Sequence, residues 1–293
     1  TGFLLAMHVS FRYASRRGKF ADDVLDFGFW ALLGGLIGAR VVFIFTKWQQ
    51  YFVTEPWVKI DAIGLKIPAV LAIWQGGLVF YGSALGGFAA FMIFSHKRKI
   101  PRLEFADICV LGLPLAHVFG RFGCVAAGCC WGRAAYHLDE AGAVIQDIPL
   151  AMHFPPGALA YDSLLRNAPQ AQIDLMHNLG TTLPLVPTQL LESFGEGIVF
   201  LILLVVMSRK LFHGQVLLTY TILYPILRST LEMFRGDVDR GFVLDGMLST
   251  SQFISLGVAT ASMITIVVIA RRRMIAQPFK APADIANEAG AKL

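Results

Sequence analysis

The sequence predicts an all-α polytopic membrane protein with seven transmembrane helices, the first of them truncated, and a small extracytoplasmic head. Three observations lead to this fold class. Of the 293 residues, 56% are hydrophobic and only 15% are charged, which lies outside the usual range of soluble domains. Apolar runs of about 20 residues, the length that a spanning helix needs, recur along the chain. Lys and Arg are concentrated in alternate loops between these runs.

Hydropathy places the spans near residues 1–11, 24–46, 74–95, 105–130, 187–207, 215–234 and 250–270. The run at 1–11 is too short to cross a membrane, so we expect the natural N-terminus and part of the first helix to be missing. Residues 131–186 are expected to form an ordered head, inserted into a single integral membrane domain of residues 1–293. The polar tail 277–293 is expected to be disordered.

The connecting segments fall into two classes by their content of Lys and Arg. These residues are dense in segments 12–23, 96–104, 208–214 and 271–293. They are sparse in segments 47–73, 131–186 and 235–249. Because cytoplasmic loops carry the excess of Lys and Arg, we expect a cytoplasmic C-terminus and an external head. The net charge of +5 is then explained by loops that face anionic lipid, and no nucleic-acid partner is expected.

Three arginines lie inside the predicted spans: Arg40, Arg121 and Arg228. A charge in hydrocarbon costs roughly 2.5 kcal/mol or more, so each arginine marks a candidate site. Arginine also holds phosphate in a fixed, bidentate geometry. A helix rises about 1.5 Å per residue, and counting from the span ends places most polar residues in the outer half of the bilayer. We therefore expect a phospholipid headgroup to bind at that depth.

Arg121 and Arg228 each belong to a polar stripe on one helix face. His117 precedes Arg121 by four residues and Glu232 follows Arg228 by four, a spacing that brings side chains together. Arg235 lies about one turn beyond Glu232 and adds a second cation to its stripe. The alternative to phosphate binding by either arginine is an internal ion pair with an acid of the same or another span.

Glu192 is one such acid, because it lies near the outer end of its span in a segment that opens with Pro187. It could line the site or simply belong to a polar helix end. His117 has two interpretations of equal weight, since it could carry a proton or serve as a hydrogen-bonded structural histidine. Both residues are kept as substrate-binding candidates.

The segment 74–87 (WQGGLVFYGSALGG) contains five glycines, which permit either close helix packing or an unwound site for lipid. Tyr81 adds a hydroxyl group among them, which favours a function for Tyr81 and Gly82 over packing alone. Gly123 belongs to a second glycine-rich segment, which surrounds Arg121.

Four cysteines occur without a C-x-x-C pair, so they give neither a zinc-binding pattern nor a disulfide framework. Cys124, Cys129 and Cys130 are close in sequence and could form a metal site or a disulfide. We expect them instead to be small apolar residues that permit tight packing, with no metal bound. A nucleophilic thiol is less favoured still, because no basic partner stands at a catalytic spacing.

Taken together and in this order, the motifs resemble those of the prolipoprotein diacylglyceryl transferase family over almost the whole chain. The motifs are GAR at 38–40, GGLVFYGSALGG at 76–87, GRFGC and GCCWG within 120–132, PTQLLES at 187–193, R-x-x-x-E-x-x-R-G-D at 228–237 and LSTSQFISL at 248–256. The resemblance implies an enzyme of the bacterial inner membrane that acts in its outer leaflet. It would move the diacylglyceryl group of phosphatidylglycerol to the lipobox cysteine of a prolipoprotein signal peptide, without a cofactor, and release glycerol phosphate.

The resemblance also implies roles for the candidate residues. Arg121 and Arg228 would bind the phosphate, and Glu232 would orient Arg228 or act as a base. Tyr81 would be a proton relay or a headgroup ligand. Gly132 matches the glycine that follows the aromatic residue closing the family's G-R-x-G stretch. The substrate-binding candidates are Gly82, Gly123, Gly132, Arg235, Glu192 and His117.

The chain departs from the family pattern at several positions. Tyr81-Gly82-Ser83 stands where familiar members have His-Gly-Gly, and Cys124 stands where many have Asn. These departures motivate one alternative, a related transferase that moves lipid to another acceptor. A second alternative is a transporter of an anionic lipid, which would place polar residues in both membrane halves and is not favoured because no inverted repeat is evident.

Overall fold

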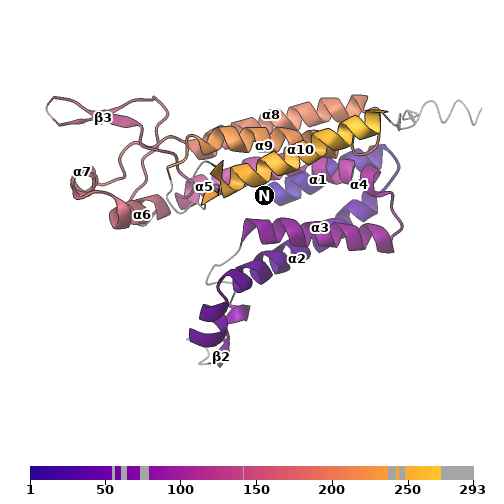
Figure 1. The fold of residues 1–293 in the computed structure, drawn as a ribbon, viewed down its shortest axis with the longest axis horizontal. Coiled ribbons are helices and arrows are strands. Elements are labelled where there is room, and N and C mark those ends of the chain that lie inside the picture. Colours follow the sequence, from indigo (N-terminus) through magenta and orange to yellow (C-terminus); the bar gives the residue numbers. More distant parts are fainter. Residues whose placement is uncertain are drawn as a thin grey trace, which may run out of the picture. The chain divides into compact units, whose positions relative to one another are not determined.

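The computed structural model describes residues 1–54, 57–60, 65–72, 79–140, 142–236, 242–243 and 248–271 (Figure 1). Its α-helices are α1 (Gly2–Arg16), α2 (Ala21–Thr46), α3 (Phe80–Lys97), α4 (Arg102–Leu111), α5 (Leu113–Ala127), α6 (Leu159–Asn167), α7 (Gln170–Leu179), α8 (Thr188–Arg209), α9 (Gln215–Glu232) and α10 (Thr250–Arg271). Two single helical turns are the π-helical η1 (Gln50–Thr54) and the 3-10 helical η2 (Ala69–Leu71). The antiparallel hairpins pair β1 (Trp57–Ile60) with β2 (Leu65–Pro68), β3 (Tyr136–Leu138) with β4 (Val144–Gln146), and β5 (Phe242–Val243) with β6 (Leu248–Ser249).

A helix occurs at each of the seven predicted spans, which supports a polytopic all-α membrane protein. Within the described residues, four stretches are long and apolar enough to cross a membrane: Ala21–Thr46, Arg102–Ala127, Thr188–Arg209 and Thr250–Ile269. The helices α1, α3 and α9 are shorter or less apolar than these four. The number of seven spans therefore stays a prediction. The tail 277–293, expected to be disordered, lies outside the described residues.

One predicted span differs in its details from the structure. The span expected at 105–130 is divided at Gly112 into α4 and α5, and it ends at Ala127. A Cβ atom at Gly112 would overlap Ala6 of α1, and Pro114 follows in the first turn of α5. Proline fits a helix start because it lacks the amide hydrogen that a continuous helix would need. The two short helices thus replace one long one.

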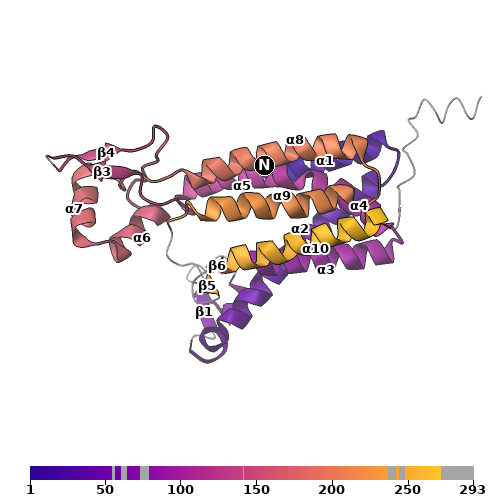
Figure 2. The same cartoon turned by 45° about the horizontal axis from the view of Figure 1, so that its top comes forward.

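The chain divides into two compact units, which are described separately. Unit 1 comprises Thr1–Ser10 and Ala106–Leu293, and unit 2 comprises Phe11–Phe105. In unit 1, α8 packs against both α5 and α9, and α9 packs against α10, so that these helices form a bundle (Figure 2). Asp107 of α4 is fully buried and accepts hydrogen bonds from the backbone amides of Gly214 and Val216 at the start of α9. A buried carboxylate there stabilises the helix N-terminus.

The expected head, residues 131–186, is folded and joined to one end of the bundle of unit 1. It contains the hairpin β3–β4 and the helices α6 and α7 around a small core, of which Trp131, Phe154 and Leu185 are buried members. Its backbone pairs with the ends of the bundle helices, since the Ala160 amide donates to the Gly128 carbonyl at 2.8 Å. The side of the membrane on which this segment lies stays a prediction.

In unit 2, glycines let α2 and α3 cross at very close range. Cβ atoms at Gly38 or Gly82 would overlap the backbone of the facing helix. Gly82 therefore has the packing role that was the alternative in the sequence, and its assignment to substrate binding stays a prediction. Arg40 is 6% exposed and donates hydrogen bonds to the carbonyls of Ala69, Val70 and Ala72. Its guanidinium group thus holds the turn η2 in place.

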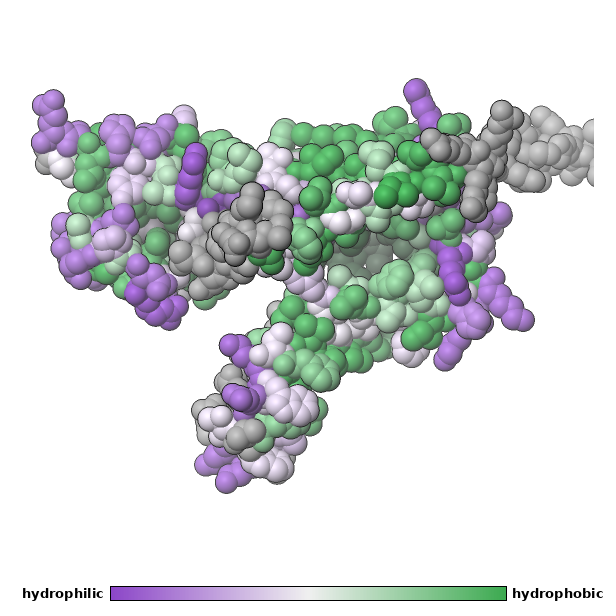
Figure 3. All heavy atoms as spheres, in the orientation of Figure 1, coloured by the Kyte–Doolittle hydropathy of each residue, from purple (hydrophilic) through white to green (hydrophobic). Residues whose placement is uncertain are grey.

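The surface has the character expected for a membrane protein. Large apolar side chains are exposed on the helices, including Phe29 and Ile37 of α2 and Phe194 and Leu201 of α8. Figure 3 shows hydrophobic residues along the helices of unit 1 and hydrophilic residues over its head. Such apolar surface is stable in contact with lipid but not with water.

Candidate active site between α5, α8 and α9

Arg121 of α5 forms an ion pair with Glu192 of α8. Its Nη2 atom lies 2.6 Å from Glu192 Oε1, and the side chains are 20% and 5% exposed. The sequence named this pairing as the alternative to phosphate binding. Charges in a low-dielectric environment need such a partner in the absence of ligand, so the pair is compatible with either role.

Arg228 and Glu232 form the second ion pair, along one face of α9. Their Nη2 and Oε2 atoms are 2.7 Å apart, as the spacing of four residues predicts. The Nη1 atom of Arg228 is buried and has no hydrogen-bond partner among the described residues. Because a buried guanidinium nitrogen without a partner is costly, this atom marks a position where an anion would bind favourably.

A second layer of polar residues follows about one turn from these pairs, toward the other end of the helices. His117 Nδ1 lies 2.8 Å from Glu196 Oε1 and 3.2 Å from the hydroxyl oxygen of Tyr220. Glu196 is fully buried. The ring of Tyr220 stacks on that of Tyr224, with 5.7 Å between their centroids. His117 is therefore hydrogen-bonded inside the bundle, as one of its two interpretations supposed.

Three members of this cluster, Glu196, Tyr220 and Tyr224, were missed in the sequence. Their signal is the same spacing of four residues that relates His117 to Arg121 and Arg228 to Glu232. On α8 it joins Glu192 to Glu196, and on α9 it runs through residues 220, 224, 228 and 232. Tyr224 lies within electrostatic range of the acids of α8 and of both arginines, so it connects the two layers.

Gly132 and Arg235 lie side by side at the head end of the bundle. The two residues form an antiparallel bridge, and the Arg133 amide donates to the Phe234 carbonyl at 2.8 Å. Gly132 is buried, and a Cβ atom there would overlap Val186 and the Phe234 carbonyl. Gly132 is thus required for this close approach, and its substrate-binding role stays a prediction.

Gly123 is different, because a Cβ atom at this position would meet no described atom within 4 Å. It lies on α5 two residues after Arg121 and is exposed. Packing within the described part of the chain therefore does not explain this glycine. Because glycine has no side chain, the surface of α5 at this position is open, as contact with a substrate would require.

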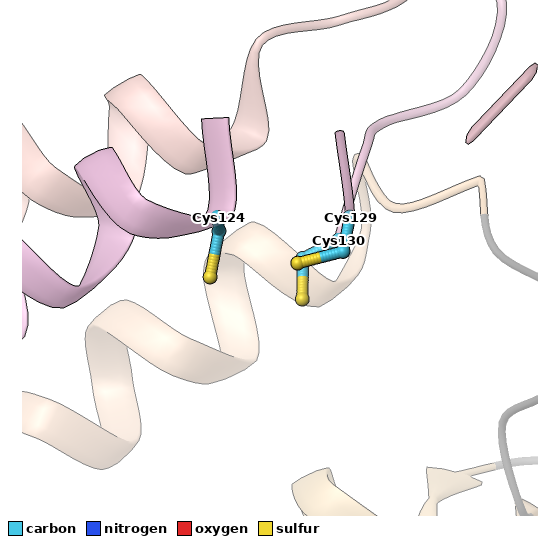
Figure 4. Close-up of side chains that lie close together, drawn as sticks. All are labelled: Cys124, Cys129 and Cys130. Atoms are coloured by element: carbon cyan, nitrogen blue, oxygen red, sulfur yellow. The ribbon is translucent and has the colours of Figure 1, made fainter. Parts of the chain in front are cut away.

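Cys124, Cys129 and Cys130 are brought together where α5 ends (Figure 4). Their Sγ atoms lie within 4.8 Å of one another, and Arg121 Nη1 donates to Cys124 Sγ at 3.8 Å. Cys130 follows the end of the helix, and its hydrogen bond with Cys124 and the charges of Arg235 and Arg121 lower its pKa to about 5. The three thiols thus lie together beside Arg121, and their expected role as small packing residues without a metal stays a prediction.

Tyr81 and Gly82 belong to α3 of unit 2, and the site described here consists of residues of unit 1. The Tyr81 side chain is 38% exposed. Its proposed catalytic role stays a prediction. Of the other sequence-based candidates, the structure places Arg121, Glu192, Arg228 and Glu232 in two ion pairs and His117 in the layer beside them.

Comparison with known proteins agrees with the motifs. A family profile for prolipoprotein diacylglyceryl transferase matches residues 1–268. The phosphatidylglycerol–prolipoprotein diacylglyceryl transferase of Oceanobacillus iheyensis is 28% identical over 278 residues, which cover 95% of this chain and 83% of the relative. The enzyme of that name from Lactobacillus delbrueckii subsp. bulgaricus is 30% identical over 268 residues, covering 91% and 82%. These matches extend over nearly the whole chain, and so the chain belongs to the prolipoprotein diacylglyceryl transferase family.

Proposed function

We propose that the protein transfers the diacylglyceryl group of phosphatidylglycerol to the thiol of a lipobox cysteine in a prolipoprotein signal peptide. A thioether forms, and glycerol phosphate leaves. This is the first step of lipoprotein maturation, and membership of the family supports it. Phosphatidylglycerol, the prolipoprotein and the surrounding membrane lipid are the partners.

The buried Nη1 atom of Arg228 is the observation that carries the proposal for the lipid site. A phosphate oxygen of phosphatidylglycerol would accept its hydrogen bond, and Arg121 would supply a second cation. Negative charge grows on the phosphate as the carbon–oxygen bond breaks. Cations fixed in place before the reaction stabilise that charge without reorganising.

Glu192 and Glu232 position the two arginines in this scheme. Each carboxylate lies less than 3 Å from a guanidinium nitrogen of its arginine, which fixes the direction of the remaining donors. Glu232 is 5% exposed and is also a candidate base for the acceptor thiol, which must lose its proton to become an effective nucleophile.

The proposed location is the bacterial inner membrane, with a cytoplasmic C-terminus and the active site toward the outer leaflet. The distribution of Lys and Arg among the loops supports this orientation. The ion pair of Arg121 lies near the head end of α5, six residues before Ala127. An external head thus places the arginines at the depth of outer-leaflet headgroups.

The direct test is transfer of labelled diacylglyceryl from phosphatidylglycerol to a lipobox peptide by the purified protein. The control peptide has serine in place of the cysteine. Arg228→Ala should lose most of the transfer and Arg121→Ala a smaller part of it, whereas Arg209→Ala, at the opposite end of α8, should retain it. If the wild type binds phosphatidylglycerol but labels neither peptide, another acceptor or lipid transport replaces this proposal.

A further inference from the structure

The three thiols at the end of α5 form a cluster that has no role in the function proposed so far. Within the described residues, Cys124, Cys129 and Cys130 are the group whose ligand atoms lie close enough to hold a metal ion, with all three Sγ atoms within 4.8 Å of one another. Figure 4 shows the three side chains directed toward a common space. Thiolates that bind one zinc ion tetrahedrally stand about 3.8 Å apart, given a Zn–S distance of about 2.3 Å. Small side-chain rotations would therefore complete such a site.

The end of α5 is built to bring Cys129 back to Cys124. Gly128 has a φ of +63°, its amide donates to the Val125 carbonyl, and the Cys129 amide donates to the Cys124 carbonyl at 3.0 Å. These two hydrogen bonds form a Schellman motif, in which the chain reverses over the last helical turn. A spacing of five residues thereby becomes a short distance between thiols, which a search for C-x-x-C cannot detect.

Side chains of α8 then hold the two cysteines that follow the turn. Gln189 Nε2 donates to the Cys129 carbonyl and Thr188 Oγ1 to the Cys130 carbonyl, both at 2.7 Å. Cys130 has a φ of +58°, which is rare for a residue with a side chain. Strained backbone of this kind persists only where neighbours over-determine it, and it is concentrated at functional sites.

The surroundings of the cluster would balance the charge of a metal centre. Three thiolates around a divalent ion carry a net charge of about −1. Arg121 donates to Cys124 Sγ, and Arg235 lies opposite Gly132, two residues beyond Cys130. Two cations thus stand next to an anionic centre, in the way that second-shell donors support metal ligands.

The number of ligands distinguishes the kind of site. A structural zinc ion takes four protein ligands, whereas a catalytic one takes three and leaves its fourth position for water or substrate. The cluster in the described part of the chain offers three. The cluster lies beside Arg121 and thus next to the proposed phosphate site. The acceptor thiol must reach the lipid at that place.

We propose that Cys124, Cys129 and Cys130 bind a zinc ion and that the acceptor thiol of the peptide occupies its fourth position. This inference rests on the proposed function, because that function supplies the thiol. The thiol would bind as a thiolate and release one proton to solvent. Its sulfur then forms a bond to the glyceryl carbon of phosphatidylglycerol. The bond from that carbon to the phosphate oxygen breaks, and its electron pair leaves with glycerol phosphate.

Metal binding can be measured on the full-length protein in detergent. Wild type, reduced with a phosphine and dialysed against a buffered zinc solution, should retain about one zinc ion per chain. Cys124→Ser and Cys129→Ser should retain none, whereas Cys109→Ser in α4, outside the cluster, should match the wild type. Elution of each variant as a single symmetric peak separates loss of a ligand from loss of the fold.

Cobalt(II) in place of zinc reports on the fourth position. Adding the lipobox peptide should change the visible spectrum of the cobalt protein through a new sulfur ligand, and the serine peptide should leave it unchanged. A wild type that transfers lipid but binds neither zinc nor cobalt overturns this inference and leaves the proposed function intact. Metal binding without a response to the peptide overturns the role of the acceptor thiol. A protein that binds metal and peptide but transfers nothing contradicts the proposed function instead.

Discussion

Arg40 and Arg228 are both arginines of predicted spans, but the partners of their guanidinium groups differ. Arg40 donates to three backbone carbonyls at one end of α2 and so stabilises a turn. Arg228 is held on one side by Glu232 and has a buried Nη1 atom without a partner among the described residues. A charged residue in a span is therefore not in itself evidence of a site. What matters is whether the fold uses all of its donors.

The largest effect is expected for Arg228→Ala. Loss of a fixed donor to a developing oxyanion costs a factor of about 10² to 10³ in rate, and transfer should fall by about that amount. Arg228→Lys should recover only part of it, because an ammonium group lacks the planar fork. Initial rates with labelled phosphatidylglycerol measure both. Near-normal transfer by Arg228→Ala would show that Arg228, like Arg40, is not required for the reaction.

Arg121→Ala should have a smaller effect, a loss of about tenfold in transfer, which corresponds to about 1.4 kcal/mol of transition-state stabilisation. Both terminal nitrogens of Arg121 already have partners, in Glu192 and Cys124, so its contribution to the phosphate is less direct. The initial transfer rates of the two variants are measured in parallel, with the same lipid and peptide. A greater loss for Arg121 than for Arg228 would assign the principal phosphate contact to Arg121.

Arg40→Ala should affect stability more than transfer. Carbonyls of Ala69, Val70 and Ala72 would lose their donor, at a cost of about 1–3 kcal/mol for buried polar groups left unpaired. The melting temperature in detergent should fall, while transfer per folded molecule stays within about twofold of wild type. Unchanged melting together with lost phosphatidylglycerol binding would show that Arg40 belongs to a lipid site.

The smallest effect is expected for Tyr220→Phe in the second polar layer. The substitution removes the 3.2 Å hydrogen bond to His117 but retains the ring that stacks on Tyr224. A single neutral hydrogen bond contributes about 1 kcal/mol, so melting should fall slightly and transfer by no more than a few fold. A loss as great as that of Arg228→Ala would show that this layer takes part in the reaction and is not only structural.

Local patterns in the sequence were sufficient for the features that a single helix determines. Hydropathy located a helix at each span, and the spacing of four residues correctly paired Arg228 with Glu232. The division at Gly112 was not predictable, because it depends on contact with Ala6 of a distant segment. The hydrogen bonds of Arg40 were not predictable either, because their acceptor carbonyls lie about 30 residues further along the chain.

The cysteines show this limit most clearly. Their spacing fits no common metal motif, and the sequence therefore favoured packing and no metal. Their proximity follows from the left-handed Gly128 and from hydrogen bonds that Thr188 and Gln189 donate from another helix. Hydrogen bonds between residues about 60 positions apart form only in the tertiary fold, so composition and periodicity do not predict them.

The most direct test of the central claim is phosphatidylglycerol binding by wild type, Arg228→Ala and Arg40→Ala in nanodiscs of zwitterionic lipid. If the buried Nη1 atom of Arg228 holds the phosphate, Arg228→Ala weakens binding by about tenfold or more, since a charge-assisted hydrogen bond contributes about 1.5–3 kcal/mol. Arg40→Ala binds as the wild type does. Equal affinity of wild type and Arg228→Ala would contradict the claim.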